Sequence, residues 1–137
     1  MKNVKQYYKE LGRLVYAIAI ADGFVQEEEK YNLHQFVLKE LAHHEKTHDS
    51  SGMNQAFYVD FEFDSYVNNH PELNGAAKSF SKFVEESIEP GDSALLERSI
   101  ALMENVANAY SKRKEKTIID QVKFKTDNLL KLNRSDK

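Results

Sequence analysis

The sequence predicts an all-α fold, a compact bundle of about six helices that forms one domain over residues 1–137. Apolar residues recur at intervals of three and four through most of the chain, and short turn-forming segments interrupt them. The composition is 30% charged and 41% hydrophobic, with 5 Gly, 2 Pro and no Cys. These values are typical of a globular domain, and the lack of cysteine excludes disulfides, thiol nucleophiles and cysteine-based metal sites.

Helical spacing and turn residues define the first half of the chain. The first helix is expected over residues 3–21, and an Asp-Gly turn ends it. The second is expected to begin near Glu27, where three glutamates suit the positive end of a helix dipole, and to end at a turn over residues 49–52. Residues 54–70 alternate apolar and polar side chains as a strand does. The chain offers that strand no partner, so we expect an irregular segment or a short helix there.

Three further helices complete the predicted bundle. They are expected over residues 74–88, from residue 92 or 93 to about 110, and over residues 115–132. A Glu-Pro-Gly sequence at residues 89–91 separates the first two, because proline and glycine interrupt helices.

Charge is unevenly distributed, although the net charge is only −3. Residues 45–110 carry 4 basic and 12 acidic groups, whereas residues 111–137 carry 9 basic and 4 acidic groups. The basic segment lacks the interleaved aromatic residues that nucleic-acid sites use, so it is interpreted as a solvated helix face. We therefore expect no nucleic-acid partner. The expected partner is an unknown protein, and the chain is expected to be a monomer or a homodimer.

The first 21 residues imitate a secretory signal, because basic residues precede an apolar run at residues 14–21. Helical spacing nevertheless continues through the basic part, as it does in the amphipathic helix of a mature protein. We therefore expect a cytoplasmic location. No apolar stretch approaches the roughly 20 residues of a transmembrane helix, so no stable membrane insertion is expected.

Residues 44–48 read His-Glu-Lys-Thr-His, which matches the H-E-x-x-H pattern of zinc peptidases. On a helix, this spacing places His44 and His48 on one face to bind zinc, with Glu45 beside them to activate water. Lys46 and the turn that follows are unusual in such an enzyme. A small zinc-dependent hydrolase is therefore the alternative function. The simpler interpretation is that the two histidines extend the apolar stripe of the helix or favour its C-terminus.

The second candidate site is the acidic segment from Asp60 to Asp64, which imitates the first ligands of an EF-hand loop. The glycine and the final bidentate carboxylate of that loop are replaced by Ser65 and Pro71, so an EF-hand is rejected. The carboxylates either form a solvated acidic face or hold a cation in another way.

The Asp-Gly turn after the first helix offers the third candidate site. Asp22, the carbonyl groups of the turn and a glutamate from the next helix are hard oxygen ligands of the kind that Ca²⁺ or Mg²⁺ prefers. Glu29 lies seven residues after Asp22, one turn into the second helix, from where it could reach back. The same residues are also explained without a metal, as a turn former and as partners of the helix dipole.

This segment resembles the TerB-like family, a group of helical domains named for bacterial tellurite resistance. The likeness covers residues 17–41, with Asp22, Gly23, Val25 and Glu29 at the motif positions. It implies a compact bundle of two related, degenerate halves, a metal ion held by acidic residues at the turn, and a role in stress response without established catalysis. The residues that the resemblance assigns to the metal are Asp22, Glu28 and Glu29, with Ca²⁺ or Mg²⁺ favoured over Zn²⁺.

The chain also departs from the family pattern. A second Asp-Gly turn is expected near residue 109, but residues 110–114 form a basic stretch there. Gln26 stands where a Ser or Asp N-cap is common. The sequence thus predicts a non-enzymatic domain that binds a cation or a partner, with the zinc hydrolase and a metal-free interaction module as alternatives.

Overall fold

The structure, a computed structural model, describes residues 1–21, 25–69, 71, 74–108 and 122–123. This part contains five α-helices and no strand: α1 (Val4–Ala19), α2 (Glu27–Phe36), α3 (Tyr58–Asn69), α4 (Ala76–Ser87) and α5 (Ser93–Asn108). The all-α prediction is confirmed for these residues. The predicted helix at residues 115–132 lies outside the described residues except for positions 122 and 123. In the described part, no helix is both long enough and apolar enough to cross a membrane.

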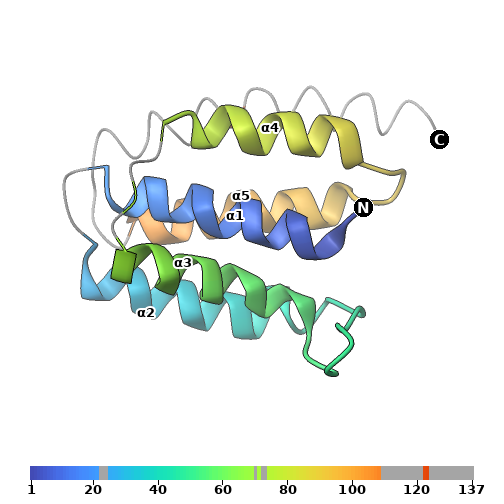
Figure 1. The fold of residues 1–137 in the computed structure, drawn as a ribbon, viewed down its shortest axis with the longest axis horizontal. Helices are drawn as coiled ribbons and strands as arrows, with labels where there is room; N and C mark the ends of the chain where they lie inside the picture. The colour runs from blue at the N-terminus through green and yellow to red at the C-terminus, as the bar shows by residue number, and fades with distance from the viewer. Residues whose placement is uncertain (22–24, 70, 72–73, 109–121, 124–137) are drawn as a thin grey trace.

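Helix α1 lies in the middle of the molecule and packs against α3, α4 and α5, while α2 packs against α5 (Figure 1). Its sequence explains this position, because buried residues cover most of its circumference. These are Tyr7, Tyr8, Leu11, Gly12, Leu14, Val15, Tyr16, Ile18 and Ala19. The apolar run at residues 14–21 is therefore largely core rather than surface.

The second helix is shorter than the sequence predicts. After α2, the chain forms one π-helical turn, Val37–Leu41, and then leaves the helical path. The Asn54 amide donates hydrogen bonds to the carbonyl groups of Ala42 (2.9 Å) and Glu45 (3.2 Å). This side chain from the following loop satisfies carbonyl groups that a longer helix would have bonded internally. The predicted end at residues 49–52 is thus wrong.

Residues 55–69 of the ambiguous segment are helical. A 3₁₀ turn, Gln55–Phe57, leads into α3. Val59 and Phe63, four residues apart, are fully buried, whereas Phe61 between them is 52% exposed. The strand-like alternation was therefore misleading, because only those apolar residues that match the helical period enter the core.

Candidate functional sites

The start of α2 contains two of the three predicted metal ligands, Glu28 and Glu29. Glu29 is fully buried, and its Oε1 accepts a hydrogen bond from the backbone N–H of Gln26 (2.7 Å). Gln26 and Glu29 form a reciprocal capping box, so Gln26 is the N-cap in place of the usual Ser or Asp. Glu29 thus has a structural role at the beginning of the helix.

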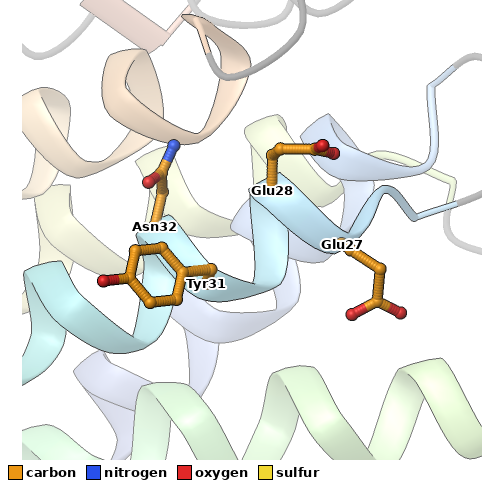
Figure 2. Close-up of a pocket in the computed structure, with 4 residues that line it drawn as sticks. All are labelled: Glu27, Glu28, Tyr31 and Asn32. Carbon is orange, nitrogen blue, oxygen red and sulfur yellow. The ribbon is translucent and has the colours of Figure 1, made fainter.

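Glu28 points away from the core. It lines an open depression of about 350 Å³ together with Glu27, Tyr31 and Asn32, all on α2. Figure 2 shows Glu28 and Asn32 extending to one side of the helix and Glu27 to the other. The third predicted ligand, Asp22, lies outside the described residues. The carboxylates of Glu28 and Glu29 therefore face different environments, one solvent and the other the core.

The H-E-x-x-H segment does not form a helix. Residues 42–44 make a turn, residues 45–47 have no regular secondary structure, and His48 pairs with Asn54 in an isolated antiparallel bridge. His44 and His48 are exposed. The helical presentation that would align the two imidazoles on zinc is thus absent, because the helix ends at Leu41.

Glu45, the general base of the hydrolase alternative, has structural partners. One carboxylate oxygen accepts a hydrogen bond from the buried Tyr8 hydroxyl. The other accepts hydrogen bonds from the backbone N–H (3.0 Å) and the hydroxyl (2.5 Å) of Thr47. Burial raises the pKa of Tyr8, and the nearby Glu45 carboxylate raises it further. Tyr8 therefore stays protonated and donates to Glu45, which anchors this loop to α1.

Asp49 organises the loop between the π-helical turn and α3. Its Oδ1 accepts hydrogen bonds from Ser51 N (2.9 Å), Ser51 Oγ (2.6 Å) and Met53 N (3.0 Å), and its Oδ2 accepts one from the Tyr58 hydroxyl (2.8 Å). Hydrogen bonds from Ser51 and Tyr58 hold the pKa of Asp49 well below its usual range. The sequence pattern predicts only a turn at this position.

The two acidic residues Asp60 and Asp64 of α3 meet His34 of α2. His34 Nδ1 lies 2.6 Å from Asp60 Oδ1, and His34 Nε2 lies 3.8 Å from Asp64 Oδ1. Burial raises the pKa of Asp60 to about 6, although His34 opposes the shift. The sequence pattern predicts that the carboxylates form an acidic face or a cation site. No sequence pattern indicates His34, because only the tertiary fold brings the three side chains together.

No three His, Asp or Glu side chains converge as metal ligands within the residues that the structure describes. Comparisons with protein-family models, with curated proteins and with solved structures gave no match to the chain. The interpretation of function therefore depends on the geometry of the chain itself.

Proposed function

We propose that the chain is a non-enzymatic helical domain of about six helices, of the TerB-like type, that acts by binding. In this proposal a divalent cation, Ca²⁺ or Mg²⁺, binds between Asp22 and Glu28 beside the turn that precedes α2. A protein partner, in a stress response, would recognise the domain. The observation that carries the cation site is the exposed carboxylate of Glu28 on the first turn of α2, six residues after Asp22 in the sequence.

The contacts at the start of α2 support different roles for Glu28 and Glu29. Glu29 caps the helix through Gln26 and so holds the first turn, from which Glu28 projects. Glu28 and Glu27 are both exposed and line the depression, and Lys30 Nζ lies 3.8 Å from Glu27 Oε1. Glu28 is therefore the carboxylate of this turn that we propose as the cation ligand. Glu29 is accordingly proposed as a residue that positions the site rather than as a ligand.

The contacts of Glu45 disfavour the hydrolase alternative. A general base must have an oxygen directed at a metal-bound water, but both Glu45 oxygens already accept hydrogen bonds from Tyr8 and Thr47. The binding role is therefore the function that the geometry supports best.

Isothermal titration of the chelator-treated full chain with Ca²⁺ and Mg²⁺ tests this proposal. We expect Asp22→Asn and Glu28→Gln each to weaken binding at least about tenfold, because each removes one charged oxygen ligand. Glu40→Gln is the matched control, since Glu40 is an exposed carboxylate in the π-helical turn that follows α2. Equal affinity in Glu28→Gln and the parent chain, or no binding of either cation, would overturn the proposal.

A further inference from the structure

The contact between His34 and the two aspartates of α3 has the geometry of half a metal site. His34 Nδ1 lies 2.6 Å from Asp60 Oδ1, and Asp60 is largely buried beneath it. When the Asp60 carboxylate accepts a hydrogen bond from Nδ1–H of a neutral imidazole, the ring lone pair lies on Nε2. Histidines that bind metals commonly have this arrangement, in which a carboxylate on one ring nitrogen orients the other toward the metal.

Asp64 supplies the second ligand of the half-site. Its Oδ1 lies 3.8 Å from His34 Nε2, and both side chains are accessible, with 51% of the Asp64 side chain and 42% of the His34 side chain exposed. Two ligands bonded at about 2.0 Å to a tetrahedral Zn²⁺ lie roughly 3.3 Å apart. A small rotation of either side chain would therefore bring His34 Nε2 and Asp64 Oδ1 to this separation. Two ligands alone do not complete a tetrahedral site.

The same surface carries the exposed large apolar side chains of the described part of the chain. These are Tyr31, Leu38 and Phe61, which are 65%, 54% and 52% exposed. Tyr31 lies three residues before His34, Leu38 four residues after it, and Phe61 three residues before Asp64. Residues three or four apart share one face of a helix, so each of these apolar side chains lies on the same helix face as a residue of the half-site. Clustered exposed apolar side chains commonly mark an interface.

We propose that this surface joins two copies of the chain around one Zn²⁺, with His34 and Asp64 of each copy as the four ligands. A two-fold axis through the metal brings the same surface of both copies together and completes a tetrahedral site of two nitrogens and two oxygens. Without metal, Asp60 and Asp64 of the two copies would place four carboxylates close together, and their repulsion opposes association. The dimer is therefore metal-dependent. This inference is independent of the cation site proposed at Asp22 and Glu28.

Sedimentation velocity of the full chain, with and without Zn²⁺, measures the association directly. We expect a monomer after chelator treatment, a dimer at one Zn²⁺ per two chains, and no dimer with Mg²⁺. A dimer that persists without metal would overturn the proposal, as would Zn²⁺ binding at one ion per chain without a change in mass.

Variants identify the ligands. His34→Ala and Asp64→Asn should each abolish the zinc-dependent dimer, and circular dichroism would verify that the helical content is unchanged, as expected for partly exposed positions. His48→Ala, which removes an exposed histidine elsewhere, should still dimerise with Zn²⁺. Asp22→Asn should also dimerise normally, which separates this site from the proposed cation site. A dimer that survives in His34→Ala would overturn the assignment.

Substitution of Co²⁺ for Zn²⁺ gives a spectroscopic test that does not depend on mass. Tetrahedral coordination by nitrogen and oxygen should produce intense visible absorption in the parent chain, and His34→Ala should lose it. Weak absorption typical of octahedral Co²⁺ in the parent chain would contradict the four-ligand site.

Discussion

Helices α1 and α3 approach each other closely at Gly12. A Cβ atom at this position would lie 2.7 Å from the Val59 carbonyl oxygen, 2.9 Å from the Glu62 Cβ and 3.2 Å from the Val59 Cα. Two of these atoms belong to the backbone and the third is a Cβ, so none of them can move without a shift of α3 itself. Glycine is required here because of helix packing and not because of its backbone conformation.

The substitution Gly12→Ala tests this contact at the scale of one residue. The higher helix propensity of alanine would by itself raise the free energy of unfolding by roughly 1 kcal/mol. We expect the opposite sign, a net loss of about 1–3 kcal/mol in the free energy of unfolding, because α1 and α3 must separate to admit the methyl group. Urea unfolding followed by circular dichroism measures the difference. An increase in stability would show that the two helices adjust without cost.

At the scale of structural elements, Asp49 links the loop after the second helix to α3. It accepts hydrogen bonds from Ser51 and Met53 within the loop and from Tyr58, the first residue of α3. The ring of Tyr58 in turn lies beneath the ammonium groups of Lys5 and Lys9 of α1, at 4.8 and 5.9 Å from the ring centroid. The ionised carboxylate of Asp49 thus connects the loop to the packing of α1 against α3.

The depressed pKa of Asp49 predicts a pH dependence of stability. Because the folded protein holds this pKa below its usual value near 3.8, the folded state binds fewer protons than the unfolded state as the pH falls below about 4. The stability that Asp49 contributes is present above that pH and is lost as the pH decreases through the folded pKa. In denaturant titrations between pH 2 and 5, Asp49→Asn should therefore show a weaker pH dependence than the parent chain. Glu85→Gln, which removes an exposed carboxylate from α4, should keep the parent slope.

At the scale of the whole molecule, a buried hydrogen-bond chain joins the central helix α1 to α5. The Tyr7 hydroxyl bonds to Ser99 Oγ, which donates to the Leu95 carbonyl oxygen at 2.8 Å. Tyr7 is fully buried, Ser99 is 1% exposed, and burial raises the pKa of Tyr7, so the phenol stays neutral. These hydrogen bonds connect residues that are 92 positions apart in the sequence.

Removing the Ser99 hydroxyl alone should cost more than removing the hydroxyl groups of both Ser99 and Tyr7. Ser99→Ala leaves the Tyr7 hydroxyl without this acceptor, and we expect a loss of about 1–3 kcal/mol, whereas Tyr7→Phe should cost only about 1 kcal/mol. The double variant should be close to Tyr7→Phe, because the orphaned hydroxyl is then absent. Urea unfolding of the four proteins forms a double-mutant cycle. Additive losses would mean that the two hydroxyl groups act independently.

The candidate sites were less predictable than the helices. The acidic residues near the start of α2 were identified from their order along the chain, but the sequence did not distinguish the buried cap Glu29 from the exposed Glu28. The Gln26–Glu29 capping box has a three-residue spacing and could have been recognised from the sequence. His34 could not have been assigned to Asp60 and Asp64, because they are 26 and 30 positions apart and no local pattern connects them.

The sequence by itself determined the all-helical character of the described chain and the approximate positions of α1, α4 and α5. Their apolar residues follow the 3.6-residue period, and glycine or proline lies near their ends, so local interactions specify them. Only the tertiary structure decided that the second helix ends at Leu41, that Val59 and Phe63 enter the core, and that His34 meets Asp60. Each of these depends on side chains from distant parts of the chain, as when Asn54 bonds the Ala42 carbonyl. Contacts of this kind arise from packing, which a local pattern does not encode.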